Sequence, residues 1–256
     1  IENTGVHGFR LDAVKHIDSF FMKNFIRDIT EKYGEDFYVF GEFWNSDEKA
    51  NNDYLESIDY RFDLVDVKLH HNLFDASKSG ADYDLRTIFD QTLAKNHSES
   101  AVTFVDNHDT QRGQALESTV EEWFKPAAYS LILLREAGLP CVFYGDYYGI
   151  SGEFAQESFQ ELLDIRLNLA YGEQSDYFDD ANCIGWTRQG MDDGQPIAVL
   201  ISNDQAASKS MLVGPEWAGR EFSDYLGNSS QIVTIDDQGW GEFPVEEKSV
   251  SVWSIR

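Results

Sequence analysis

Short apolar runs alternate with amphipathic stretches along the first two thirds of the chain. The runs have the length of buried strands and occupy residues 8–12, 37–42, 62–65, 101–105 and 141–144. Apolar residues recur at helical spacing at 17–29, 67–76, 85–94, 123–137 and 159–170. Strands that alternate with helices are typical of βα units, so the pattern predicts an α/β architecture with a parallel sheet. Residues 47–57 are mostly polar and are expected to connect the second strand to the third.

The pattern changes at about residue 172 to short alternating segments separated by turn residues. The predicted strands are at 183–187, 197–202, 210–213, 220–224, 231–235 and 249–255. Such spacing is typical of antiparallel sheets. We therefore expect two domains, an α/β domain over residues 1–171 and a small antiparallel β-sandwich over residues 172–256.

Five parallel strands are too few to close an eight-stranded TIM, or (β/α)8, barrel. The chain opens at Ile1 without an initiator methionine or a leader, and it enters a strand within a few residues. We expect it to begin partway through a larger protein and to supply strands 4 to 8 of the barrel. An open half-barrel exposes sheet edges, so it should need the missing N-terminal part of the barrel, or a partner chain, for stability.

Three of the predicted parallel strands lead to an acid. Asp12 and Glu42 end the first two, and Asp109 follows the fourth closely. Barrel enzymes place their chemistry at the carboxyl ends of the strands, so these acids are expected to converge there. Carboxylates that meet in one cleft point to chemistry on a glycosidic bond.

Composition narrows the choice of partners. The chain has 46 acidic and 20 basic residues, a net charge of −26, which disfavours nucleic acid and anionic membranes as partners. A neutral substrate meets no such repulsion. No apolar run approaches the length of a membrane span. Cys141 and Cys183 lack metal-ligand spacing and are expected to be buried reduced thiols, which favours the cytoplasm.

Three motifs carry a resemblance to a known family. They are Gly8-Phe9-Arg10-Leu11-Asp12-Ala13-Val14-Lys15-His16, Gly41-Glu42-Phe43-Trp44 and Phe104-Val105-Asp106-Asn107-His108-Asp109-Thr110. In this order they resemble the second, third and fourth signature regions of the α-amylase family, glycoside hydrolase family 13. The stretch from Trp123 to Asp146 is similar to the bacterial liquefying and cytoplasmic members. A weaker likeness continues into the C-terminal β-domain of the family.

The resemblance implies a role for each acid. Asp12 would be the nucleophile that forms a covalent glycosyl-enzyme, and Arg10 on the same strand face would keep it ionised. Glu42 would be the general acid that protonates the leaving oxygen and later the base that activates water. Asp109 would stabilise the transition state. The implied activity is retaining hydrolysis of internal α-1,4 bonds in starch, glycogen or maltodextrins.

The resemblance also implies residues that bind the α-glucan. Lys15 and His16 match positions on the leaving-group side, Trp44 would offer a stacking face to a sugar ring, and His108 would hold sugar hydroxyls. In calcium-containing relatives the backbone carbonyl at the position of His16 is also a calcium ligand. The other ligands would lie before Ile1, so we expect only a partial calcium site in this chain.

Two departures from the family limit this interpretation, and three alternatives stay open. The first signature region and the inserted domain after the third strand are absent, so the chain alone is expected to be inactive.

A related transglycosidase, such as a branching or trehalose-forming enzyme, would use the same acids. A non-catalytic binding or scaffold protein would have the same fold, although such relatives lose the acids. Secretion stays open because the N-terminus of the complete protein is expected to lie before Ile1.

Overall fold

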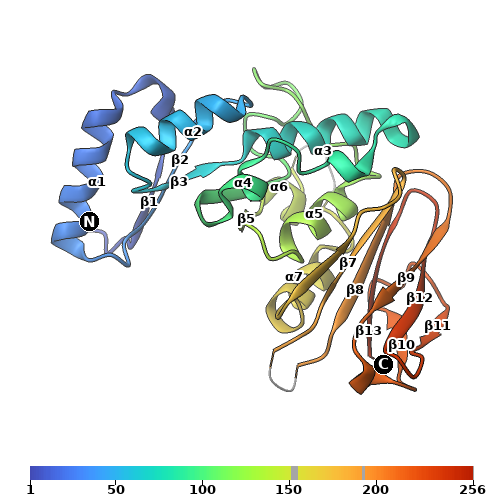
Figure 1. Cartoon of the computed structure of the whole chain (residues 1–256). Helices are drawn as coiled ribbons and strands as arrows, with labels where there is room; N and C mark the ends of the chain where they lie inside the picture. The colour runs from blue at the N-terminus through green and yellow to red at the C-terminus, as the bar shows by residue number, and fades with distance from the viewer. Residues whose placement is uncertain (151–154, 192–193, 256) are drawn as a thin grey trace. The chain divides into compact units, whose positions relative to one another are not determined.

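The computed structural model describes residues 1–150, 155–191 and 194–255 (Figure 1). Its contacts divide the chain into two compact units. The first comprises Ile1–Asn72, Phe89–Phe104 and Ala137–Cys141. The second comprises Leu73–Ile88, Val105–Glu136 and Val142–Arg256. The parallel sheet lies wholly in the first unit, and the antiparallel sheets lie wholly in the second.

The first unit is built on a parallel sheet that has, over the described residues, five strands in the order β1-β2-β3-β4-β5. The strands are β1 (Gly8–Leu11), β2 (Tyr38–Gly41), β3 (Asp63–Val65), β4 (Ala101–Phe104) and β5 (Leu139–Cys141). Every neighbouring pair is parallel. Strands that follow one another in chain order form a barrel wall rather than a doubly wound sheet. The predicted half of a (β/α)8 barrel is confirmed.

Helices connect the strands, and local capping explains where they start. Helix α1 (Ser19–Tyr33) begins where the Asp18 carboxylate accepts a hydrogen bond from the Phe21 amide, and it ends at Gly34. Helix α2 (Glu48–Ser57) occupies the segment expected to be a polar connection. The segment does connect the second strand to the third, and its polar composition hid the helix because only Asn51, Tyr54 and Leu55 are buried. Asp47 caps the helix by accepting a hydrogen bond from the Ala50 amide.

The remaining helical segments range from single turns to the 13 residues of α3. They are η1 (Val14–His16), α3 (Val67–Ser79), η2 (Gly80–Asp82), η3 (Leu85–Thr87), α4 (Leu93–Asn96), η4 (Ser98–Ser100), α5 (Lys125–Leu133), α6 (Tyr144–Tyr148) and α7 (Phe159–Asn168). No described helix has both the length and the apolar character that crossing a membrane requires.

The strand expected at 141–144 lies two residues earlier, and α6 takes its place. The Asp146 carboxylate, in the first turn of α6, accepts hydrogen bonds from Lys125 Nζ at 2.6 Å and Tyr129 Oη at 2.5 Å. A carboxylate there also suits the helix dipole. Cys141, at the end of the edge strand β5, is exposed, so its expected burial is wrong; Cys183 is buried, and both thiols are free.

The second unit contains a six-stranded and a two-stranded antiparallel sheet among its described residues. The larger sheet has the order β11 (Ile232–Thr234), β10 (Glu221–Asp224), β13 (Val250–Ile255), β8 (Ile197–Ser202), β7 (Cys183–Arg188) and β6 (Gln174–Tyr177). The smaller pairs β12 (Trp240–Val245) with β9 (Ala207–Leu212). One core, which includes Met211, Phe222, Phe243 and Trp253, joins the two sheets. The segment β6 was missed because its only apolar residue is Tyr177, and β12 was missed because Gly241 and Pro244 are untypical of strands.

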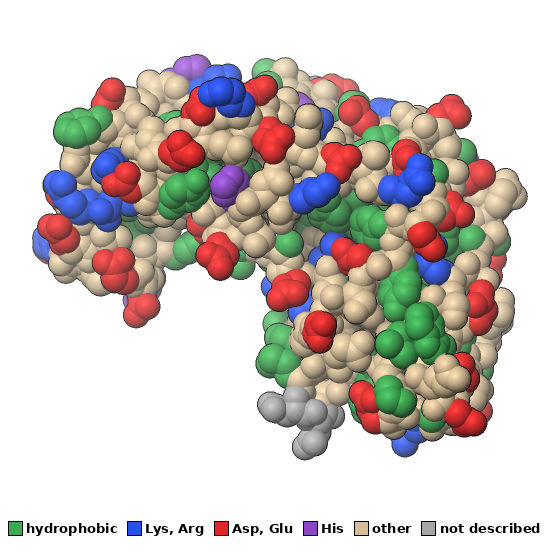
Figure 2. All heavy atoms as spheres, in the orientation of Figure 1, with side chains coloured by type: hydrophobic (Ala, Val, Ile, Leu, Met, Phe, Trp, Pro, Cys, Tyr) green, Lys and Arg blue, Asp and Glu red, His purple; other side chains and the backbone are tan. Residues whose placement is uncertain are grey.

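Acidic side chains are scattered across the visible face of the molecule and do not gather in one patch (Figure 2). Several ion pairs, such as Lys32 with Glu2 and Lys49 with Asp53, lie at the surface. Exposed pairs of this kind contribute little to stability. The acids on this face therefore form a solvated surface rather than a single charged patch.

Gly41, the last residue of β2, allows the strand to approach the core. A Cβ atom there would lie 2.7 Å from the Phe62 ring and 3.1 Å from Val14. The residue must therefore be glycine for the following residue, Glu42, to keep its position.

The Gly41→Ala substitution should lower the free energy of unfolding by about 1–3 kcal/mol, because the added methyl overpacks the site. Urea denaturation of the variant measures the loss. Phe62→Leu, made alone and together with Gly41→Ala, provides a double-mutant cycle. We expect the double variant to lose less than the sum of the single losses. Strict additivity would show that the Phe62 contact is not the cause.

Candidate active site

Asp12 and Glu42 are neighbours because β1 and β2 run parallel in register. Leu11 pairs with Gly41, so the next residue of each strand emerges at the same level of the sheet edge. The Glu42 amide donates to the Leu11 carbonyl at 2.8 Å, and the Val14 amide donates to the Glu42 carbonyl at 3.1 Å. The backbone ladder thus continues past the strands and fixes where both side chains start.

Arg10 links the two acids. Its Nη1 donates to Asp12 Oδ1 at 2.8 Å, and its Nη2 donates to Glu42 Oε2 at 3.2 Å. A guanidinium is planar and presents its donors in a rigid fork, so one side chain can hold two carboxylates at once. The predicted convergence of the first two acids is therefore realised in the structure through a shared cation.

The two acids differ in their exposure to water. The Glu42 side chain is 11% exposed and that of Asp12 is 73% exposed. Glu42 Oε2 also accepts a hydrogen bond from the Ala13 amide at 3.2 Å, and Ala13 has the left-handed backbone conformation, with φ 50°. Glu42 is thus buried and held at one oxygen, whereas Asp12 beside it is open to solvent. This asymmetry suits the two acids to different roles.

The other predicted residues of the first unit lie around this pair. Lys15 and His16 form the short helix η1 directly after Asp12, and both are exposed. Lys15 Nζ donates to the Trp44 carbonyl at 3.3 Å. Trp44 is half-buried, with its ring about 6 Å from those of His70 and Phe104. Packing thus fixes the Trp44 ring.

Asp109 and His108 belong to the second unit, and a local turn organises them. The Asn107 side-chain oxygen accepts hydrogen bonds from the amides of Asp109 at 2.9 Å and Thr110 at 3.0 Å. Thr110 Oγ1 in turn accepts from the Asn107 amide at 2.9 Å. His108 Nε2 lies 3.3 Å from Asp109 Oδ2, and both side chains reach solvent. The turn presents Asp109 with His108 beside it.

A buried charged cluster supports this turn, and the sequence analysis missed it. Lys125 Nζ lies 3.5 Å from Asp106 Oδ2 and 2.6 Å from Asp146 Oδ1. Asp106 Oδ1 accepts hydrogen bonds from Thr110 Oγ1 and the Val120 amide. Burial raises the pKa of Asp106 to about 7, against a lowering effect of Lys125 and with a further raising effect of Asp146. With Glu122 Oε1 at 3.2 Å, three carboxyl groups therefore surround one ammonium group.

Asp66 shows that an acid after a strand can be purely structural. It follows β3, is fully buried, and accepts hydrogen bonds from the amides of Leu69 at 3.0 Å and Ala94 at 2.8 Å. Burial raises its pKa. One of these amides lies in α3 and the other in α4, so the Asp66 carboxylate joins the two helices.

The described residues do not make a calcium site by themselves. Calcium takes six to eight oxygen ligands. No group of three or more His, Cys, Asp or Glu residues within the described ranges is arranged to hold a metal ion. The partial calcium site expected at the backbone carbonyl of His16 stays a prediction.

Comparison with known families explains this arrangement. Residues 1–198 match the family model for the α-amylase catalytic domain, and residues 197–254 match that for the α-amylase C-terminal domain. The chain belongs to the α-amylase family. Its members are glycoside hydrolases, so the paired acids on β1 and β2 lie in the catalytic domain of a hydrolase family.

Individual relatives agree with this membership. The chain is 47% identical over 254 residues to a glucan 1,4-alpha-maltohexaosidase of Bacillus sp. (strain 707). The aligned region covers 97% of this chain and 49% of that protein. It is 38% identical to the cytoplasmic alpha-amylase of Escherichia coli (strain K12), over 100% of this chain and 54% of that one. The chain thus spans about half the length of the curated relatives it matches.

A solved structure supports the fold. The alpha-amylase of Geobacillus thermoleovorans, complexed with acarbose, superposes with a TM-score of 0.69 over 100% of this chain and 61% of that chain, at 22% identity. At this identity the likeness is one of fold. It agrees with a parallel barrel wall followed by a β-domain in this member of the α-amylase family.

The raised pKa of Asp106 predicts a pH dependence of stability. Between about pH 4 and pH 7 the unfolded chain releases the Asp106 proton while the folded chain retains it, so folding weakens by up to about 1.4 kcal/mol per pH unit. Asp106→Asn should remove this contribution and so flatten the slope, whatever its effect on absolute stability. Urea unfolding across the same range measures the slope.

Asp237→Asn, at an exposed position of the same unit, is the matched control and should keep the slope of the original chain. An unchanged slope in Asp106→Asn would show that this carboxyl is already ionised at low pH in the folded protein.

Proposed function

We propose that the protein carrying this chain hydrolyses internal α-1,4-glucosidic bonds of starch, glycogen or maltodextrins with retention of configuration. The observation that carries the proposal is the contact of one guanidinium, that of Arg10, with both Asp12 and Glu42. Retaining glycosidases keep their two carboxyl groups only about 5 Å apart. A shared cation is a means of holding two acids at such short range.

In the first step an oxygen of Asp12 attacks the anomeric carbon while the bond to the leaving oxygen breaks. Glu42 gives its proton to that oxygen, and a covalent glycosyl-enzyme forms on Asp12. Arg10 keeps Asp12 ionised by charge and hydrogen bonding. The exposure of Asp12 supports this role, since a nucleophile must be reachable by the sugar.

In the second step Glu42, now a carboxylate, takes a proton from a water molecule that attacks the anomeric carbon. The bond to Asp12 breaks and the carboxylate is regenerated. Two displacements at one carbon restore its original configuration. The burial of Glu42 supports its role as an acid that exchanges one proton within a shielded site.

The remaining predicted residues bind the glucan in this proposal. Asp109 stabilises the positive charge that develops on the sugar, and His108 holds its hydroxyls. Lys15 and His16 contact the leaving-group side, where their exposure after Asp12 leaves them accessible. Trp44 stacks on a sugar ring, a use supported by its half-buried, packed position.

Three further features belong to the whole protein. Additional barrel strands complete the wall beyond the edge strands β1 and β5. A calcium ion, where present, takes the His16 carbonyl among ligands from outside this chain. The cytoplasm is the proposed location, supported by two free thiols and by a relative that is itself a cytoplasmic enzyme. The boundary of the β-domain at residue 172 stays a prediction.

Glu42→Gln in the complete protein should lower kcat by several orders of magnitude, because the amide has no proton to give to the leaving oxygen. Hydrolysis of soluble starch, followed by the release of reducing ends, measures the loss. Glu56→Gln, at an exposed position on α2, is the matched control and should retain full activity. A Glu42→Gln enzyme with full activity would refute the proposed role.

Maltoheptaose distinguishes hydrolysis from transfer and tests retention. Proton NMR of the first products should show the α-anomer before mutarotation, since both displacements occur at the same carbon. Maltose and maltotriose should dominate the products. Early β-anomer would contradict retention, and oligosaccharides longer than the substrate would indicate a transglycosidase instead.

A further inference from the structure

A chain of polar contacts joins the start of helix α5 to the turn that carries Asp109, within the second unit. Lys125 Nζ lies 3.5 Å from Asp106 Oδ2, and the Thr110 hydroxyl donates to Asp106 Oδ1 at 3.2 Å. The Thr110 oxygen accepts from the Asn107 amide at 2.9 Å. The Asn107 side-chain oxygen accepts from the Asp109 amide, also at 2.9 Å. A buried ammonium group is thus connected to the backbone of Asp109 through three residues.

The Thr110 hydroxyl is the link whose direction matters. It has one proton to donate and two acceptors within reach, Asp106 Oδ1 at 3.2 Å and the Asn107 carbonyl at 3.4 Å. An ionised carboxylate is the stronger acceptor, and a hydroxyl that donates to it accepts more strongly from the Asn107 amide. Burial raises the pKa of Asp106, and Lys125 opposes that rise. Lys125 therefore favours the charged form of Asp106 that directs the hydroxyl.

Lys125 occupies an unfavourable place for a cation. Its side chain is 1% exposed, and it is the first residue of α5, where the helix dipole disfavours positive charge. Asp106, Glu122 and Asp146 offset this cost by surrounding the ammonium group. A buried ion pair often adds no more stability than apolar residues of the same volume. Positioning of the neighbouring turn accounts for such an arrangement better than stability does.

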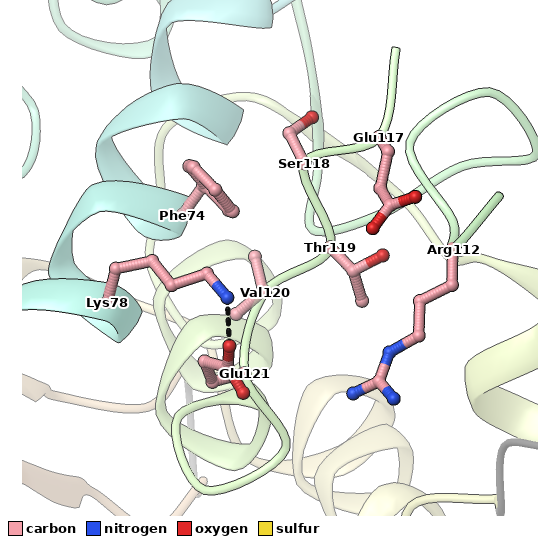
Figure 3. A pocket seen from close by; sticks show the side chains of 8 residues that line it. All are labelled: Phe74, Lys78, Arg112, Glu117, Ser118, Thr119, Val120 and Glu121. Carbon is pink, nitrogen blue, oxygen red and sulfur yellow. Dashed lines mark hydrogen bonds and ion pairs between the residues drawn. The ribbon is translucent and has the colours of Figure 1, made fainter. Parts of the chain in front are cut away.

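The backbone of the turn has a second support, the segment at 112–121. The Ser118 amide and the Thr119 hydroxyl both donate to the Thr110 carbonyl, each at 2.9 Å. The segment and α3 line a cavity of about 350 Å³, where Lys78 forms an ion pair with Glu121 (Figure 3). The Thr110 backbone is therefore held independently of its hydroxyl. Removal of the hydroxyl should cut the link to Lys125 without unfolding the turn.

We propose that Lys125 is a positioning residue for Asp109, acting through Asp106 and the Thr110 hydroxyl. The consequence for catalysis rests on the proposed function, because it requires Asp109 to stabilise the transition state. The link from Lys125 to the turn does not depend on that function. Lys125 itself contacts no substrate and takes part in no bond change.

The first measurement is hydrogen exchange of the Asp109 amide, followed by NMR of the complete protein. Thr110→Val removes the hydroxyl at nearly constant shape and should accelerate this exchange about tenfold, because Asn107 loses the hydrogen bond to its amide. Lys125→Met should accelerate it in the same direction. Thr110→Ser retains a hydroxyl and should exchange like the original protein. If Lys125→Met does not fold, the two Thr110 variants carry the test.

The second measurement is the hydrolysis of maltoheptaose by the complete protein. Thr110→Val and Lys125→Met should each lower kcat about tenfold through the misplacement of Asp109. KM should change less than about threefold, since Asp109 acts on charge that develops in the transition state. The double variant should be no slower than the slower single variant, because both substitutions cut the same chain of contacts.

Thr187→Val is the matched control in the same unit. Thr187 is buried in β7, and its hydroxyl has no hydrogen-bond partner within the part of the chain that the structure describes. The same loss of a buried hydroxyl should here change neither the exchange of the Asp109 amide nor kcat.

The outcomes separate this proposal from the proposed function. Equal exchange of the Asp109 amide in the original protein and in Thr110→Val would overturn the link, and so would kcat losses that multiply in the double variant. A complete protein that does not hydrolyse the glucan would refute the proposed function, and the exchange measurement would still decide the link.

Discussion

The parallel pairing of β1 with β2 is the constraint on which the candidate active site depends. With Leu11 opposite Gly41, the next residues of the two strands emerge side by side although they are thirty positions apart in the chain. Like charges at that distance repel, and Arg10 offsets the repulsion by contacting both. Gly41 is part of the same constraint because the approach of β2 to the core leaves no room for a side chain.

The acids that follow the parallel strands differ in burial. The buried ones hold neighbouring segments in place, and the exposed ones face solvent. Asp66 and Asp106 are buried among backbone donors or a lysine and hold helices and turns in place. Asp12 and Asp109 reach solvent and are available to a ligand. Glu42 lies between these extremes, shielded but linked to Arg10. Desolvation costs are large for a carboxylate, so each buried one needs its own set of partners.

The candidate acids of the two units are positioned by different physical means. Strand register positions Asp12 and Glu42, whereas a side-chain turn through Asn107 positions Asp109. That turn depends on contacts distant in sequence, with Lys125 supporting it through Asp106 and Thr110. A change in this buried cluster can therefore alter the turn at residues 107–110 without touching Asp109 itself.

The sequence by itself determined the alternation of strands and helices, the parallel wall, the antiparallel second part and the family, because period and motif are local properties of the chain. It also placed Asp12 and Glu42 directly at strand ends, where the structure has them. The sequence did not predict helix α2, the actual position of β5 or the exposure of Cys141. These three features depend on which residues are buried and on which strand lies at the edge of the sheet. Only the tertiary structure showed that Arg10 contacts both acids, that Lys125 lies between Asp106 and Asp146, and that α3 closes a cavity with the segment at 112–121. These are contacts between distant segments, and no local pattern encodes them.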